Sequence, residues 1–335
     1  MYTNLGNSGL VVSKMALGLG FRGQKDPKEA TKTIHKAIDF GINFIDCANI
    51  YGLLDDRKNA GTSEEILGRS IIGKRDQLVI TSKISSLVGT PPNNKGTSRY
   101  YILNQIEASL KRLQTDHIDI YLFHGVDNST PDEEKFRTME MLIQQGKIRY
   151  VGVCNLQAWQ VVKSLNAQKS INAAPLITIQ NPYSLLNREV EREMLPMIRE
   201  LGIGMMAFSP LAVGLLSGIF DSKKFPSTYW GSKRRKQFDE IFKDKVIDVC
   251  NTLKTISSEL GYTMAQIAQA WILSKPEVST IITGADNTEQ LDENLKSLEV
   301  KLSRKHIETL EQASHNLHIP LDNIKYSNKT SERSY

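Results

Sequence analysis

The sequence predicts an α/β fold, and within that class a (β/α)8 TIM barrel with an N-terminal β-hairpin and an extra C-terminal helix. Eight short apolar runs alternate with helical patterns along nearly the whole chain, as βα units require. The runs are continuously apolar, which is typical of parallel strands covered by helices. A length of 335 residues suits one barrel around one core. An open doubly wound sheet uses the same units and remains the alternative fold.

The first element is a predicted β-hairpin at about residues 1–13, because Gly6-Asn7-Ser8-Gly9 is a turn sequence. The barrel strands are then predicted at 15–18, 43–46, 78–81, 118–123, 149–153, 177–180, 204–208 and 280–282. Helical patterns lie between them at 28–40, 63–72, 98–113, 132–145 and 188–201.

Capping residues support several of these helix ends. Asp26-Pro27 places an N-cap and a proline at the first helical position before residue 28, and Thr130-Pro131 offers the same arrangement before residue 132. Gly41 follows the first helix at a C-cap position, where a positive φ is favoured.

The region 212–243 breaks the alternation, because it is rich in Gly, Ser, Lys and aromatic residues without clear periodicity. It predicts a long loop after the seventh strand, and loops of that length are often functional. Residues 303–317 predict the extra helix, and a polar tail follows from about 318 to 335. We therefore expect one domain over residues 1–335.

Composition indicates an ordinary globular protein, with 40% hydrophobic and 24% charged residues and a net charge of +5. This charge does not favour nucleic acid as a partner. No apolar run approaches 18 residues and the N-terminus lacks a signal-peptide pattern, so a cytoplasmic location is expected. Cys47, Cys154 and Cys250 are widely spaced, which predicts reduced thiols and no metal site.

Gly18, Gly20 and Gly23 fit the dinucleotide fingerprint GxGxxG, and Asp46 ends the next strand, where a ribose-binding acid would lie. A Rossmann-type dehydrogenase is therefore one alternative. In that motif the glycines lead directly into a helix, whereas here four residues separate Gly23 from the helix signal. The turn is better explained as a close passage of backbone past a ligand or strand, and Gly20 is counted as a cofactor-binding candidate.

Three titratable residues follow consecutive predicted strands, at the end where barrels hold reactive groups: Asp46, Lys83 and His124. Tyr51 lies in the loop after Asp46. Taken singly, each has a structural interpretation, such as a helix cap, a solvated cation or a packing aromatic. At one end of one barrel they predict a catalytic site, because perturbed titratable groups cluster at such sites.

The chemistry of this set is proton donation beside an oxyanion site. An adjacent Lys83 ammonium is expected to lower the pKa of the Tyr51 phenol from about 10 toward neutrality. Asp46 is expected to pair with Lys83, and His124 to hydrogen-bond a substrate oxygen. The set suits reduction of a carbonyl compound, and because side chains supply no hydride, a nicotinamide cofactor is expected.

In combination, FIDCANIYG, SEEILG, TSK and DHIDIYLFH resemble motifs of the aldo-keto reductase family, over a match that runs from the hairpin to about Val300. The resemblance implies an NAD(P)H-dependent oxidoreductase that reduces an aldehyde or ketone to an alcohol, or the reverse. It also implies that Asp46, Tyr51, Lys83 and His124 form the catalytic tetrad.

The same resemblance implies a set of cofactor contacts. VGVCNL and QNPYSLLNR are similar to the segments that hold the nicotinamide carboxamide, MAFSPL to the stacking and pyrophosphate segment, and TGADNTEQLDEN to the adenosine segment. The implied residues are Cys154, Asn155, Gln180, Phe208, Ser209, Leu211, Gly214, Gly284, Asp286, Gln290, Glu293 and Asn294.

Three departures from the family pattern bear on function. Cys154 replaces a serine, and a thiol is a weaker hydrogen-bond donor. Asp286 stands near the expected 2′ position, where a carboxylate repels a phosphate, so NAD(H) is an alternative to the family's usual NADP(H). The stretch LLDDRKNAGT, residues 53–62, is longer than usual and borders Tyr51.

Candidate pocket residues and partners complete the predictions. The expected partner is a small carbonyl compound or alcohol, without nucleic acid or membrane. A non-catalytic dinucleotide-binding regulatory subunit on the same scaffold is the alternative function.

The basic run at 233–236 is expected to be a solvated surface, or to close on cofactor phosphates. The candidate pocket residues are Phe21, Leu53, Leu54, Val126 and Trp230.

Overall fold

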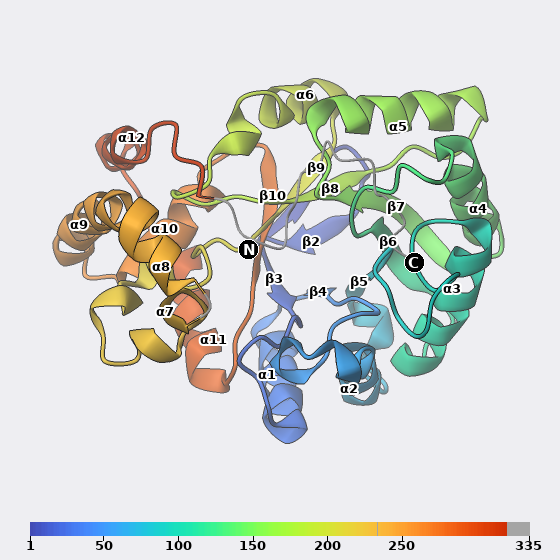
Figure 1. Ribbon diagram of the computed structural model, residues 1–335, viewed down its shortest axis with the longest axis horizontal. Coiled ribbons are helices and arrows are strands. Elements are labelled where there is room, and N and C mark those ends of the chain that lie inside the picture. Colours follow the sequence, from blue (N-terminus) through green and yellow to red (C-terminus); the bar gives the residue numbers. More distant parts are fainter. Residues whose placement is uncertain (233, 320–335) are drawn as a thin grey trace.

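Eight short runs of apolar residues pair in parallel and close into a barrel in the computed structural model, which describes residues 1–232 and 234–319. Consecutive strands are neighbours around the barrel, and β10 pairs with β3 to close it. Figure 1 shows the helices as an outer layer around these strands. The predicted (β/α)8 barrel is confirmed, and the open doubly wound alternative is wrong.

The barrel strands are β3 (Met15–Gly18), β4 (Phe44–Asp46), β5 (Val79–Ile84), β6 (Ile118–Phe123), β7 (Ile148–Cys154), β8 (Thr178–Pro182), β9 (Gly204–Phe208) and β10 (Val278–Thr283). β3, β6 and β9 have the predicted ranges, and the others differ by a few residues. The largest difference is in β5, because Lys83 and Ile84 continue to pair with Leu122 and Phe123 of β6. Polar side chains at the end of β5 hid this extension from a pattern based on apolar residues.

Most predicted helices are present. Asp26 caps α1 by accepting a hydrogen bond from the Lys28 amide at 2.9 Å, and Gly41 ends it with φ 104°. Thr130 does not cap α4, because its hydroxyl donates to the Asp127 carboxylate instead. The helices of the outer layer are α1 (Pro27–Phe40), α2 (Thr62–Ser70), α3 (Arg99–Leu113), α4 (Asp132–Gln144), α5 (Ala158–Ser170), α6 (Met194–Leu201), α9 (Lys243–Leu260), α10 (Met264–Leu273), α11 (Thr288–Leu295) and α12 (Arg304–Ala313).

The N-terminal hairpin pairs β1 (Tyr2–Asn4) with β2 (Val11–Ser13) and covers the amino end of the barrel. Leu5 and Val12 are fully buried and belong to the cluster that fills the barrel interior. The amide of Gly6 donates to the Ser279 hydroxyl near the start of β10. The hairpin therefore closes the end opposite the predicted site, and access is left at the carboxyl ends of the strands.

The segment predicted as a long loop is folded into short helical turns. Their shared anchor is Trp230, which is fully buried and donates its indole N–H to the Ala212 carbonyl at 3.0 Å. Figure 1 shows α7 and α8 beside α9. Most aromatic residues of this segment are buried but are not spaced with helical periodicity, which explains why the sequence pattern missed these turns. They are η5 (Leu215–Ser217), η6 (Ile219–Asp221), η7 (Phe225–Ser227), α7 (Tyr229–Ser232), α8 (Arg235–Gln237) and the π-helical η8 (Phe238–Phe242).

Two predicted helices are shorter than expected. The helix predicted at 188–201 is α6, preceded by the 3-10 turn η4 (Glu189–Glu191), and the extra C-terminal helix is α12. The guanidinium of Arg188 donates to the Glu311 carbonyl and the Ser314 hydroxyl, which ties α12 to the barrel. Of the predicted polar tail, residues 320–335 lie outside the described residues. Within the described ranges no helix combines the length and apolarity that a bilayer span requires.

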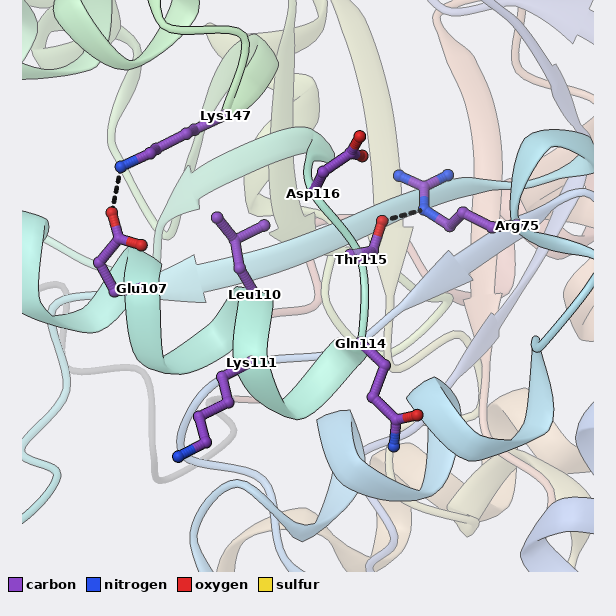
Figure 2. Close-up of a pocket in the computed structure, with 8 residues that line it drawn as sticks. All are labelled: Arg75, Glu107, Leu110, Lys111, Gln114, Thr115, Asp116 and Lys147. Carbon is purple, nitrogen blue, oxygen red and sulfur yellow. Dashed lines mark hydrogen bonds and ion pairs between the residues drawn. The ribbon is translucent and has the colours of Figure 1, made fainter.

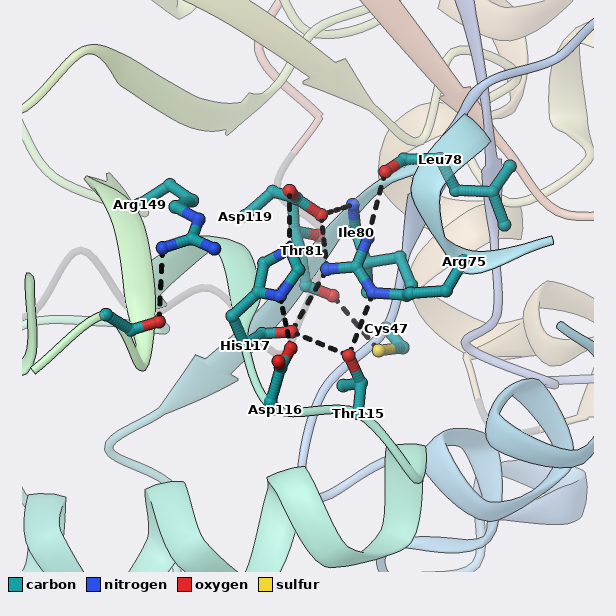
Figure 3. Close-up of polar contacts among 11 residues, drawn as sticks. Cys47, Arg75, Leu78, Ile80, Thr81, Thr115, Asp116, His117, Asp119 and Arg149 are labelled. Atoms are coloured by element: carbon teal, nitrogen blue, oxygen red, sulfur yellow. Dashed lines mark hydrogen bonds and ion pairs between the residues drawn. The ribbon is translucent and has the colours of Figure 1, made fainter. Parts of the chain in front are cut away.

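A polar cluster stabilises the amino end of β5 and β6 (Figure 3). The Arg75 guanidinium donates to the Asp119 carboxylate at 2.7 Å and to the His117 carbonyl at 3.0 Å. The same carboxylate accepts the Ile80 amide at 2.8 Å, so it joins β5 to β6. Both side chains of the ion pair are 15% exposed. Groups at this end of a barrel typically serve stability.

A groove lies at the same end of the barrel, between the carboxyl end of α3 and the starts of β6 and β7 (Figure 2). Its charged side chains have partners within it and next to it: Lys147 pairs with Glu107, and Arg75 pairs with Asp119 and also donates to the Thr115 hydroxyl at 3.1 Å. The groove is on the opposite side of the barrel from Tyr51. We therefore assign it no part in the predicted chemistry.

The Arg75–Asp119 pair is expected to matter for stability and not for the site at the other end. Replacing Asp119 with Asn should lower the free energy of unfolding by about 2 kcal/mol, because a half-buried guanidinium then lacks its anion. Denaturant unfolding followed by circular dichroism measures this. As a control, Asp39→Asn breaks an exposed pair with Lys74 and should cost about 0.5 kcal/mol or less. Equal losses in the two variants would contradict the stabilising role.

Candidate active site

The four predicted catalytic residues converge at the carboxyl ends of three adjacent strands. Asp46 is the last residue of β4, Lys83 lies near the end of β5, and His124 directly follows β6. Tyr51 enters from the loop after β4 and lies with its hydroxyl 3.4 Å from Nε2 of His124. Parallel pairing of β4, β5 and β6 brings these residues together, because their carboxyl ends share one rim.

Lys83 is fully buried and its ammonium is saturated with hydrogen bonds. It donates to Oδ2 of Asp46 at 2.7 Å, to the Cys47 carbonyl at 2.9 Å and to the Tyr51 hydroxyl at 3.2 Å. An ammonium has three protons, and these contacts use all of them. The lysine is therefore held in one position, directed at the phenol.

The Asp46 carboxylate is held from both sides of the barrel. Its Oδ1 accepts the Thr81 hydroxyl at 2.6 Å and the Gln180 side-chain amide at 2.7 Å. Thr81 lies on the neighbouring strand β5, whereas Gln180 reaches across from β8. Three side-chain donors therefore fix this carboxylate, counting Lys83. Charge-assisted hydrogen bonds of this kind are about twice as strong as neutral ones.

Tyr51 and His124 are the two members of the set that are partly exposed, whereas Asp46 and Lys83 are buried. Their rings meet edge to face with centroids 5.5 Å apart. The phenol hydroxyl and the imidazole Nε2 therefore face the mouth of the barrel together, with the ion pair behind them. A substrate oxygen can contact both groups at once.

The ionisation of these groups follows from burial and from the ion pair. Burial raises the pKa of Tyr51 to about 12, although the Lys83 charge acts to lower it. The expectation that Lys83 brings this pKa down toward neutrality is therefore wrong in this structure, because desolvation of the phenolate is the larger effect. For Lys83, burial acts to lower the pKa, but the charge of Asp46 outweighs it and the pKa is raised.

The surroundings of His124 favour its neutral form. Burial, followed by the charges of Lys83 and Arg57, holds its pKa well below the ordinary value of 6.5. A neutral imidazole has one N–H and one acceptor nitrogen, so it can hydrogen-bond either a carbonyl or a hydroxyl oxygen. Tyr51 is consequently the group with a proton to give.

A cradle for an amide group lies beside the ion pair, at the ends of β7 and β8. Asn155 donates its side-chain amide to the His124 carbonyl at 2.9 Å, and its own Oδ1 is buried with no partner among the described residues. Oδ1 of Asn155 and Oε1 of Gln180 are acceptors for an NH2 group. The Cys154 thiol donates weakly to Gln180 Oε1 at 3.7 Å, and its single S–H can rotate to donate to a carbonyl instead. These donors and acceptors fit a nicotinamide carboxamide.

Comparison with known proteins agrees with this geometry. The model of the Aldo/keto reductase family matches residues 14–315. The chain belongs to the aldo/keto reductase family. Members of this family are in general NAD(P)H-dependent oxidoreductases.

Among its relatives, the uncharacterized oxidoreductase YrpG of Bacillus subtilis (strain 168) is 38% identical over 316 residues, which cover 90% of this chain and 92% of the relative. Two plant proteins are named probable voltage-gated potassium channel subunit beta. The Arabidopsis thaliana protein is 38% identical and the Oryza sativa subsp. japonica protein 36% identical, each over 307 residues that cover 89% of this chain and 91% of the relative.

Close contacts explain two of the three glycines in the glycine-rich turn at residues 18–23. A Cβ on Gly18 would lie 2.7 Å from the Ile282 side chain of β10, and one on Gly23 would lie 2.2 Å from the Asp286 carboxylate. Gly20 instead faces open space, and α1 begins only at Pro27. Two of the glycines therefore permit close packing, and the Rossmann-type alternative is wrong because the sheet is a closed barrel.

The residues implied for the nicotinamide ring and the pyrophosphate lie at the end of β9 and directly after it. Phe208 is the last residue of this strand and is partly exposed, as a ring that stacks on a ligand must be. Ser209 has φ 54° and Gly214 has φ 90°, so the backbone turns sharply on both sides of Leu211. This turn lies at the same rim as Tyr51.

The residues implied for adenosine form a connected segment at β10 and α11. The Asn294 amide donates to the Gly284 carbonyl at 3.3 Å, and Gln290 Oε1 accepts the Asp286 amide at 2.9 Å. The Glu293 carbonyl accepts the side chain of Gln266. Several of these residues therefore also make hydrogen bonds that hold the backbone of this segment in place.

The candidate pocket residues differ in exposure. Leu54 is 56% exposed, Leu53 and Val126 are partly exposed, and Phe21 is 6% exposed with φ 48°. Trp230 is fully buried. Its placement favours a packing role inside the segment after β9 over contact with substrate.

The basic run is the predicted solvated surface at Arg235 and Lys236, but not at Arg234. Arg234 is 6% exposed, with its guanidinium carbon 4.8 Å from the Trp230 ring centroid. Arg235 pairs with Asp239 at 2.5 Å and lies over the Phe225 ring. Lys236 remains exposed, and Lys233 lies outside the described residues. Packing on the nearby Trp230 ring explains why Arg234 is buried.

Two features of the site were missed from sequence. Thr81 lies two residues before Lys83, and side chains two apart on a strand share a face, so the TSK motif already held this signal. The effect of Arg57 on His124 had no signal, because it depends on the path of the 53–62 loop. All three cysteines are buried free thiols, as predicted. Among the described residues no cluster of metal-binding side chains is present.

The buried ion pair makes a stability prediction that does not depend on activity. Lys83→Met should lower the free energy of unfolding by about 3–5 kcal/mol, because it leaves the Asp46 carboxylate buried without a cation. The double variant Asp46→Asn, Lys83→Met should recover part of this loss, since no charge is then buried. Denaturant unfolding of the three proteins measures both effects. A double variant no more stable than Lys83→Met alone would contradict the explanation.

Proposed function

We propose that the protein is a carbonyl reductase that converts an aldehyde or ketone to an alcohol, or catalyses the reverse, with Tyr51 as the proton donor. The observation that carries this proposal is the phenol at the mouth, 3.2 Å from the Lys83 ammonium and 3.4 Å from the His124 imidazole. A bound nicotinamide supplies the hydride that side chains cannot.

The proposed roles of the residues follow from their contacts. The carbonyl oxygen lies between the Tyr51 hydroxyl and Nε2 of His124, where both groups hydrogen-bond it. As negative charge develops on that oxygen, Tyr51 transfers its proton. The phenolate that remains is stabilised by the Lys83 ammonium, which Asp46 holds charged and in place. In the oxidative direction the phenolate accepts the proton from the alcohol.

The carboxamide cradle supports nicotinamide as the cofactor. In the proposal Asn155 and Gln180 accept its NH2 group, and Cys154 contacts its carbonyl. Phe208, Ser209, Leu211 and Gly214 are proposed for the ring and pyrophosphate, with Gly20 near the ligand. The adenosine contacts are proposed for Gly284, Asp286, Gln290, Glu293 and Asn294.

A test of the proposal is turnover with a reactive aromatic aldehyde and NADPH or NADH, followed by cofactor absorbance. Tyr51→Phe should lower kcat by 100-fold or more, because it removes the proton donor and leaves the packing of the ring. Dinucleotide binding, measured by fluorescence titration, should change little. Full carbonyl reduction by Tyr51→Phe would overturn the proposed mechanism.

The names of the two plant relatives favour a second candidate, a dinucleotide-binding regulatory subunit without turnover. The same assay separates the two functions. Tight binding of NADPH or NADH by the unmodified protein, without turnover of any carbonyl compound in a panel, would support the regulatory role.

For the cofactor we propose NADP(H), the usual choice of the family that the sequence resembles, with NAD(H) as the alternative that Asp286 favours. The Asp286 carboxylate lies against the Gly23 backbone, where burial raises its pKa and hydrogen bonds from Gly23 and Gln290 oppose that rise. A charge in this position disfavours a 2′-phosphate.

A small carbonyl compound or alcohol is the proposed partner, not nucleic acid or a membrane, and the cytoplasm is the proposed location.

Removing this charge should shift the cofactor preference. Asp286→Asn is expected to improve the affinity for NADPH relative to NADH by about three- to tenfold, the size of one screened repulsion at about 6 Å. Fluorescence titration with each cofactor measures the ratio. Asp292→Asn is the matched control, because Asp292 is an α11 carboxylate that pairs with Lys36 and should leave the ratio unchanged. A constant ratio in Asp286→Asn would rule out the repulsion.

A further inference from the structure

The 53–62 insertion is folded tightly beside the candidate proton donor. It contains two short turns, η1 (Leu53–Asp55) and η2 (Arg57–Asn59). Leu54 and Asp55 have φ 58° and 54°, a left-handed conformation that costs a residue with a side chain roughly 1–2 kcal/mol. Such strain persists only where surrounding contacts hold the backbone, so this insertion has a defined path.

The contacts that hold the insertion lead to Tyr51. The Ser63 amide donates to the Tyr51 carbonyl at 3.2 Å, which returns the end of the insertion to its start. A Cβ on Gly52 would lie 2.6 Å from the carbonyl oxygens of Asp56 and Asn59, so η2 packs directly on the residue after Tyr51. The Leu54 amide donates to the Gln24 carbonyl at 3.0 Å, which fixes the insertion to the loop after β3.

Arg57 begins η2, between the two residues whose carbonyls pack on Gly52. Its side chain is exposed, and no hydrogen bond or ion pair joins its guanidinium to the described part of the chain. The neighbouring Asp56 is engaged otherwise, because its carboxylate accepts the Lys58 amide at 3.0 Å and caps η2. The guanidinium is thus a cation held near the mouth without an anion of its own.

The position of η2 against Gly52, the residue after Tyr51, places the charge of Arg57 close enough to act on the imidazole at the mouth. Arg57 is accordingly among the groups that lower the pKa of His124, after burial and Lys83. Of the four charges that the insertion carries, that of Arg57 is the one among the three causes of this lowered pKa.

We propose that Arg57 makes the site selective for carbonyl compounds that carry an anionic group, with a carboxylate bound by the guanidinium while the carbonyl oxygen lies between Tyr51 and His124. This inference rests on the proposed reductase function and names its substrate class. A guanidinium suits the task because it is always charged and its planar donors match the two oxygens of a carboxylate. Since Arg57 is exposed, solvent and salt screen the interaction and its effect is modest.

The test compares 4-carboxybenzaldehyde with its methyl ester, two aldehydes of similar reactivity and shape that differ in charge. In Arg57→Gln the ratio of kcat/KM for the acid to kcat/KM for the ester should fall about fivefold, as expected for an exposed ion pair. Arg57→Lys should retain part of the ratio. Lys58→Gln, which removes an equal charge one residue away, should leave it unchanged. In the unmodified protein the ratio should fall as the salt concentration rises.

The possible outcomes separate the inference from the function on which it rests. If Arg57→Gln lowers both substrates together and the ratio stays constant, Arg57 supports the loop and the selectivity proposal is wrong. If neither the acid nor the ester is reduced with either cofactor, the proposed function itself fails. Binding of 4-(hydroxymethyl)benzoate, the alcohol product, is then measured by calorimetry. Equal affinity of the unmodified protein and Arg57→Gln for this anion would overturn the role of Arg57 without any turnover.

Discussion

The buried ion pair between Lys83 and Asp46 is the constraint on which the rest of the site depends. A lysine with no exposed surface needs a partner for its charge, and the carboxylate at 2.7 Å provides one. Asp46 in turn is fixed by Thr81 and by Gln180 from across the barrel. Because this network leaves the ammonium no freedom, it presents a fixed positive charge to Tyr51 at the mouth.

The barrel separates this chemistry from its stabilising elements. At the amino end the hairpin and the Arg75–Asp119 cluster close the interior and join strands. At the carboxyl end the loops are free to differ, and one of them, residues 53–62, carries Arg57, whose charge contributes to the lowered pKa of His124. Selectivity can therefore be set by loop residues while the ion pair beneath them stays in place.

Much of the fold and the catalytic set could be predicted from sequence, because both depend on local pattern. Strands such as β6 and β9 are apolar runs bounded by polar residues, and Asp46, Lys83 and His124 each follow such a run. Predictions failed where side-chain contacts outside any regular periodicity decide. Trp230 and Arg234 are buried by aromatic neighbours after β9, and the Thr130 hydroxyl bonds Asp127 in place of capping a helix.

The sequence by itself determined the succession of parallel βα units and the four residues that follow their strands, since such units place all strand ends on one side. Closure of the strands into a barrel was decided by the structure. Tertiary structure alone decided how those residues behave. Burial holds the pKa of Tyr51 near 12 despite the adjacent lysine, Gln180 bonds Asp46 from β8, and the charge of Arg57 helps to lower the pKa of His124. These effects depend on desolvation and on distances between segments remote in the chain, which no local pattern encodes.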